Sequence, residues 1–156
     1  MRRGFGGRAS VAARIWCALV MAVLASSCQT SAAEVLPPPA PVVEVAMREY
    51  RFDYDGAIPS GRVVFRAVNA GTLLHRVVVF QMSDDLPPID ELLRGSEQRI
   101  MVPLAGIPPQ LPGASGTFAL DLAPGRYAMI CTLVSRDNNE THALKGMASE
   151  FRVQGQ

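Results

Sequence analysis

The sequence predicts an all-β domain, a β-sandwich of short strands. Segments of β character follow one another after residue 41, separated by turn residues, and several alternate between apolar and polar positions. Val63, Phe65 and Ala67 share one face of such a segment, and Arg62 and Arg66 share the other, as in a strand with one solvated face. The expected strands are residues 42–47, 50–54, 62–68, 75–82, 116–122, 125–133 and 148–154.

Turn signals lie at 57–61, 69–71 and 122–125, where Gly, Pro and Asn are concentrated. A single short, peripheral helix is expected over residues 87–93. It has a proline at its start, Asp90 and Glu91 in its first turn, and Gly95 just after its end.

Length and composition fit one globular domain, because the chain has 156 residues and 49% of them are hydrophobic. Charged residues make up 19% of the chain, with a formal net charge of +1. There is no basic excess that would favour nucleic acid and no acidic tail. The function must therefore be inferred from a local site.

The N-terminal segment has the pattern of a secretory signal peptide. Arg2, Arg3, Arg8 and Arg14 precede an apolar, uncharged run over residues 15–25, about half the length of a membrane-spanning helix. We therefore assign residues 1–27 to a signal peptide and expect export, to the periplasm of a bacterium. Without the four arginines the chain keeps 11 basic and 14 acidic residues, a net charge of −3.

The sequence is compatible with two cleavage sites for this signal peptide. Residues 24–28 resemble a bacterial lipobox, which would place a lipid on Cys28 and anchor the protein at a membrane surface. Cleavage after the small residues 31–33 would instead release a soluble protein. A proline-rich stretch at 36–41 completes a stiff linker over residues 28–41, and the folded domain is expected over 42–156.

Four residues of this sequence have side chains of the kinds that bind metal ions. Cys17 leaves with the signal and Cys28 is lipidated or removed, so Cys131 is a lone thiol that cannot form an internal disulfide. His75 and His142 are the only histidines. Taken singly, these residues and Met147 are ordinary core or loop residues. Together, two imidazoles, a thiolate and a thioether form the set of a trigonal copper site with a weak axial Met, which favours copper over zinc.

The residues around these ligands resemble the cupredoxin family over about 115 residues. The turn 69–71 leads to His75, residues 122–127 contain a Pro-Gly-x-Tyr approach to Cys131, and residues 142–147 begin with the histidine and end with the methionine of the ligand loop. The resemblance implies a Greek-key β-sandwich holding one copper ion that cycles between Cu(I) and Cu(II). It also implies an electron carrier rather than an enzyme.

Two positions depart from the better-known blue copper proteins. The loop between Cys131 and His142 is longer, and Arg76 occupies a place that often holds an asparagine linking the two ligand loops. We therefore expect a different set of hydrogen bonds around the ligands.

Three functions remain open at this point. An electron carrier would meet a redox partner protein, and a copper-buffering or delivery module would meet a copper-receiving protein. The third possibility is a metal-free structural domain. The methionines of the exported part are scattered rather than clustered, which favours the carrier. We expect a monomer that binds no nucleic acid and touches a membrane only through a lipid on Cys28.

Overall fold

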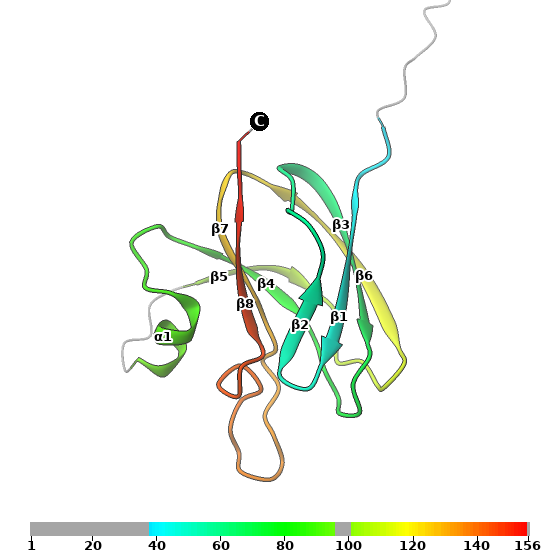
Figure 1. Ribbon diagram of the computed structural model, residues 1–156, viewed down its shortest axis with the longest axis vertical. Helices are drawn as coiled ribbons and strands as arrows, with labels where there is room; N and C mark the ends of the chain where they lie inside the picture. Colours follow the sequence, from blue (N-terminus) through cyan, green and yellow to red (C-terminus); the bar gives the residue numbers. More distant parts are fainter. Residues whose placement is uncertain (1–37, 96–100, 156) are drawn as a thin grey trace, which may run out of the picture. The chain divides into compact units, whose positions relative to one another are not determined.

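The computed structural model describes residues 38–95 and 101–155, which form two four-stranded sheets packed face to face and one short helix (Figure 1). In spatial order, the first sheet contains β2 (Arg51–Tyr54), β1 (Val42–Arg48), β3 (Gly61–Asn69) and β6 (Ser115–Leu122). The second contains β5 (Val102–Gly106), β4 (Val78–Met82), β7 (Gly125–Ile130) and β8 (Ala148–Val153), and the helix α1 spans Ile89–Arg94.

The connections cross between the sheets, as expected of a Greek-key sandwich. The chain passes from β3 to β4, returns from β5 to β6, and crosses again to β7. Strands β1 and β3 are parallel, and every other pair is antiparallel. The predicted all-β sandwich with one short helix is confirmed.

The predicted signal peptide (1–27), Cys28 and the linker up to residue 37 lie outside the described residues. No helix in the described part of the chain is long and apolar enough to cross a membrane.

Alternation in β3 has the predicted consequence. Val63, Phe65 and Ala67 are fully buried between the sheets, whereas Arg62 and Arg66 are exposed. These apolar residues belong to the main core, which both sheets line.

Strand β7 is buried on both faces, which is why its sequence is apolar at successive positions. Tyr127 and Met129 point into the main core. Ala128 and Ile130 belong to a second cluster on the other face, where α1 covers the sheet. The helix was predicted over residues 87–93 and spans Ile89–Arg94, so it starts two residues later than expected and stops before Gly95, as predicted.

Strand β5 was not predicted, because its sequence neither alternates nor favours β structure. It includes Pro103, which lacks the N–H that a central strand must donate. The structure places β5 at the edge of the second sheet, where a proline is tolerated.

The two strands that lead to the predicted ligands are shorter than expected. The strand predicted at 75–82 begins at Val78, and the strand predicted at 125–133 ends at Ile130. His75 makes only an isolated bridge with Gln110, so it lies before β4, while Cys131 lies just after β7. Both ligand candidates therefore sit where regular pairing stops.

A buried ion pair fastens the helical segment to the second sheet. Arg126 Nε and Nη2 donate to Glu150 at 2.9 and 3.1 Å, and Nη1 donates to the carbonyl oxygens of Leu86 at 2.7 Å and Ser83 at 3.2 Å. Glu150 also accepts from the Ile89 N–H at the start of the helix. Arg126 holds the pKa of Glu150 below its usual value.

Replacing Arg126 by Met should lower the free energy of unfolding by about 3 kcal/mol, because it leaves a part-buried carboxylate and several carbonyl groups without their donor. Arg62→Met is the matched control: Arg62 pairs with Asp121 at 2.9 Å with both side chains exposed, and its loss should cost less than about 1 kcal/mol. Urea unfolding at neutral pH measures both. Equal losses in the free energy of unfolding would show that the buried pair stabilises the fold no more than the exposed pair does.

Candidate metal centre

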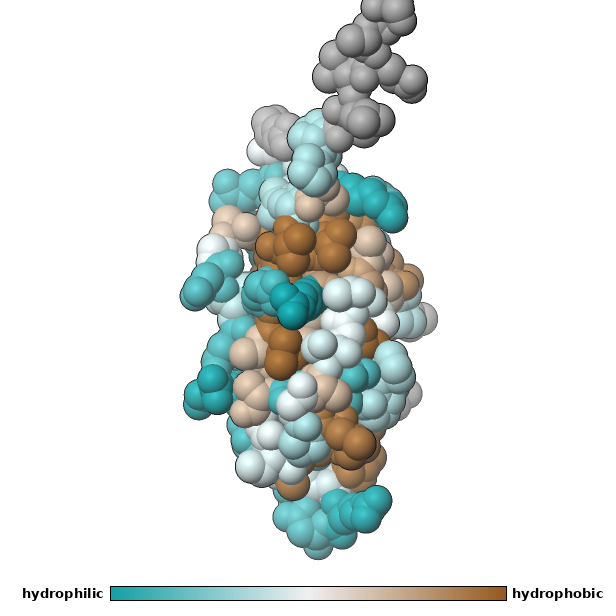
Figure 2. Space-filling view, turned by 90° about the vertical axis from the view of Figure 1, so that its right-hand side faces the viewer, coloured by the Kyte–Doolittle hydropathy of each residue, from teal (hydrophilic) through white to brown (hydrophobic). Residues whose placement is uncertain are grey.

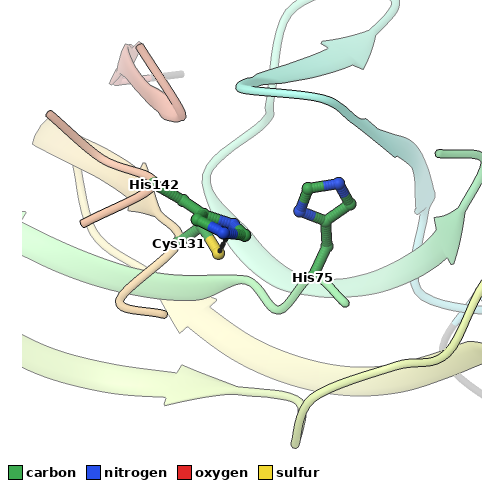
Figure 3. Close-up of side chains that lie close together, drawn as sticks. All are labelled: His75, Cys131 and His142. Atoms are coloured by element: carbon green, nitrogen blue, oxygen red, sulfur yellow. Dashed lines mark hydrogen bonds between the residues drawn. The ribbon is translucent and has the colours of Figure 1, made fainter. Parts of the chain in front are cut away.

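His75, Cys131 and His142 converge at one end of the sandwich. Their candidate ligand atoms all lie within 4.8 Å of one another, and all three residues are buried (Figure 3). Cys131 Sγ and His142 Nδ1 are 3.6 Å apart. His75 lies in the connection between β3 and β4, and Cys131 and His142 lie in the loop between β7 and β8, so the fold joins distant parts of the sequence.

Asn69 fixes the approach to His75. Its side-chain amide donates to the carbonyl oxygens of Leu73 at 2.7 Å and Gln110 at 2.8 Å, and its Oδ1 accepts from the Gly71 N–H at 3.0 Å. The backbones of His75 and Gln110 exchange two further hydrogen bonds, of 3.2 and 2.7 Å. Asn69 is fully buried, so these bonds hold His75 with little freedom to move.

The long loop between Cys131 and His142 does not separate these two side chains. It folds back on itself as a narrow hairpin, closed by His142 N–H to Leu133 O at 2.7 Å and by Ser135 N–H to Glu140 O at 2.8 Å. The additional residues project away from the core, forming the lowest loop in Figure 1. Cys131 and His142 therefore meet at the base of the hairpin.

The backbone of Met147 forms hydrogen bonds with both Cys131 and His142. Its N–H donates to His142 O at 2.8 Å, and its carbonyl accepts from the Cys131 N–H at 3.0 Å. Its side chain is fully buried and belongs to the main core. The assignment of Met147 as a weak axial ligand stays a prediction.

Burial keeps both imidazoles neutral. Desolvation lowers the pKa of His75, and desolvation, followed by the nearby His75, lowers the pKa of His142. Within residues 38–95 and 101–155, neither ring nitrogen of His75 has a hydrogen-bond partner. A buried imidazole in this condition has a free lone pair, as a metal ligand requires.

Burial also raises the pKa of the Cys131 thiol, although the backbone N–H groups of Arg76 and Leu133 favour the thiolate and oppose the shift. The thiol is therefore protonated in the metal-free protein. A metal that binds Cys131 must displace this proton, so affinity should rise with pH. Thiolate and imidazole donors suit copper or zinc and do not suit Mg²⁺ or Ca²⁺.

Two residues beside the site were missed by the sequence analysis: Glu49 and Tyr50, which form the turn between β1 and β2. Glu49 accepts hydrogen bonds from the backbone of Thr72 and from Leu73 N–H at 3.1 Å. The Thr72 backbone bond is the main cause that lowers the pKa of Glu49 to about 2. The ring of Tyr50 stands edge-on to that of His142, with centroids 5.4 Å apart. The sequence carried no signal for either residue, and Tyr50 was predicted to begin the strand at 50–54.

Apolar side chains surround the surface above His142. The exposed members are Leu73 (42%), Leu74 (40%), Leu111 (68%) and Val134 (49%), which line a hollow with Tyr50 and His142 itself. Only 5% of His142 is exposed there. Figure 2 shows apolar surface towards the lower part of one face, above a hydrophilic tip.

No protein-family model and no curated protein matches this sequence. Among solved structures, the chain is similar to dithionite-reduced auracyanin from Roseiflexus castenholzii, with 21% identity over 74% of this chain and 98% of that one, and a TM-score of 0.54. Auracyanin B is 24% identical over 78% of this chain and 94% of that one, also with a TM-score of 0.54. These likenesses show that the fold is that of the cupredoxins.

The metal-free protein should lose stability as the pH falls from 7.5 to 5.5. Both histidines have folded pKa values below the ordinary 6.5, so the unfolded chain binds more protons in this window. Each contributes a slope of up to about 1.4 kcal/mol per pH unit. Urea unfolding at several pH values measures the slope, and His142→Gln should reduce it. A flat profile would contradict the burial of neutral imidazoles, since carboxylates titrate mainly below this range.

Proposed function

We propose that this protein is an exported, mononuclear copper protein that carries single electrons. His75, Cys131 and His142 are the primary ligands and Met147 is the weak axial ligand. The observation that carries the proposal is the convergence of three buried donors, one of them a lone thiol, within 4.8 Å. A copper ion bound there would supply one-electron chemistry by cycling between Cu(I) and Cu(II).

The donor set supports copper over zinc. Structural zinc sites are closed by four Cys, His or carboxylate ligands. Within the described residues, the cluster contains one Cys and two His and no carboxylate. Glu49 lies beside the cluster, with its Oε1 3.7 Å from Nε2 of His75, and is not a member of it. Met147, fully buried and next in the loop, offers the soft fourth donor that suits copper.

Burial of the ligands supports a carrier over a copper-delivery module. Delivery requires the receiving protein to place its own ligands on the metal, yet His75 and Cys131 are fully covered and His142 almost so. Electron transfer needs only a close approach to the site. The closed geometry therefore favours a metal that stays in place.

The apolar surface above His142 is the proposed docking surface for the redox partner protein. Leu73, Leu74, Leu111 and Val134 form a ring of exposed apolar side chains there. A partner that covers them would exclude water and bring its own redox group close to the His142 ring. Scattered exposed leucines need no explanation, but a cluster over a buried site favours an interface.

Copper-loaded, oxidised protein should show an intense visible absorption band with one Cu(II) bound per chain, because charge transfer from a thiolate requires Cys131 as a ligand. Cys131→Ser should remove the band. Ser135→Ala, a control in the same loop, should retain it. Absorption spectra and copper analysis of the three proteins make the comparison.

A colourless wild-type protein that binds no copper would support the metal-free structural alternative. Retention of the same band by the serine variant would show that the thiol of Cys131 is not a ligand.

We also propose that a lipid on Cys28 holds the protein at a membrane surface, with the proline-rich linker as a spacer. Cys28→Ala should move the protein from the membrane fraction to the soluble exported fraction and leave its visible spectrum unchanged. Cell fractionation and the mass of the mature N-terminus measure this. A soluble wild-type protein that begins near residue 33 would contradict the anchor.

A further inference from the structure

The imidazole of His75 is buried, yet its two nitrogens face different surroundings. Figure 3 shows one ring nitrogen towards Cys131 and His142 and the other facing away from them. Nε2 lies 3.7 Å from Oε1 of Glu49, so Nδ1 is the nitrogen left for the cluster. His142 also presents Nδ1 to the sulfur.

A neutral imidazole carries one proton, and the partner of one nitrogen decides which nitrogen keeps a lone pair. Glu49 is an acceptor without a proton at working pH. Its separation from Nε2 exceeds an ordinary hydrogen bond by about 0.7 Å, so the two groups must approach by that amount for the bond to form.

Glu49 is held in place without help from a metal. Its Oε1 accepts from the Thr72 N–H, from Thr72 Oγ1 at 3.0 Å and from Leu73 N–H at 3.1 Å. The carboxylate also fits against Gly71, where an added Cβ would lie 2.5 Å from Oε1. The loop that leads to His75 therefore forms a binding site for this carboxylate.

We propose that Glu49 is a positioning residue of the metal centre: its carboxylate accepts the Nε2 proton of His75 and so directs the Nδ1 lone pair to the metal. Its negative charge also favours the more positively charged, oxidised state of the metal. The second statement rests on the proposed copper function, whereas the first applies to the metal-free protein as well.

Four variants separate the geometry of Glu49 from its charge. Glu49→Gln keeps a carbonyl acceptor and removes the charge, and Glu49→Leu removes both. Gly71→Ala keeps the charge but displaces the carboxylate from its binding site in this loop. Gly71 has no positive φ, so the backbone at this position accepts alanine. Glu44→Gln removes an exposed carboxylate from β1, about 16 Å farther along the strand, and is the control for charge alone.

Nitrogen-15 NMR of the metal-free proteins at pH 8 reads the tautomer of His75 directly. Wild type, Glu44→Gln and Glu49→Gln should carry the proton on Nε2, and Glu49→Leu and Gly71→Ala should show a mixture of both tautomers. A proton on Nδ1 in the wild type would overturn the proposal, as would one unchanged tautomer in all five proteins. This measurement does not depend on copper, so it remains decisive even if no copper binds.

Cyclic voltammetry of the copper-loaded proteins tests the effect of the charge. Glu49→Gln should shift the reduction potential to more positive values with the visible band retained, and Glu44→Gln should leave the potential at the wild-type value. Equal potentials for the wild type and Glu49→Gln would overturn this part of the proposal. Equal shifts in both Gln variants would do so too, because any surface carboxylate would then have the same effect.

Discussion

The constraint on which the rest of the structure depends is the burial of two imidazoles and a thiol at one end of the sandwich. Within the described residues neither ring nitrogen of His75 has a hydrogen-bond partner. An unpaired buried polar group costs about 1–3 kcal/mol, so this imidazole lowers the stability of the metal-free chain. A metal ion that takes its lone pair reverses this cost and links metal binding to stability. The stability supplied by the dense core of the two sheets offsets this loss.

The scaffold holds the ligands through backbone bonds and one buried amide. Asn69 ties two loop segments together, and the base of the hairpin keeps Cys131 and His142 adjacent despite the residues between them. The backbone N–H of Arg76, which any residue except proline supplies, lowers the pKa of the Cys131 thiol and so favours the thiolate. This effect comes from the backbone and does not depend on which side chain stands at position 76.

Much of the fold could be predicted from the sequence because β3 alternates cleanly and the helix has strong boundary residues. The grouping of His75, Cys131 and His142 followed from their chemistry and the cupredoxin resemblance. Strand β5 was missed because an edge strand with a proline has no period to detect. Glu49 could not be found either, since its contact with the loop before His75 joins residues more than twenty positions apart. Such contacts depend on the parallel pairing of β1 with β3, which no local pattern predicts.

X-ray absorption at the copper edge tests the central claim most directly, because it counts the atoms bound to the metal. In the oxidised, copper-loaded protein we expect one short sulfur neighbour and two imidazole nitrogens, with the sulfur lost in Cys131→Ser. A shell of nitrogen and oxygen atoms alone in the wild-type protein would contradict a copper centre formed by His75, Cys131 and His142.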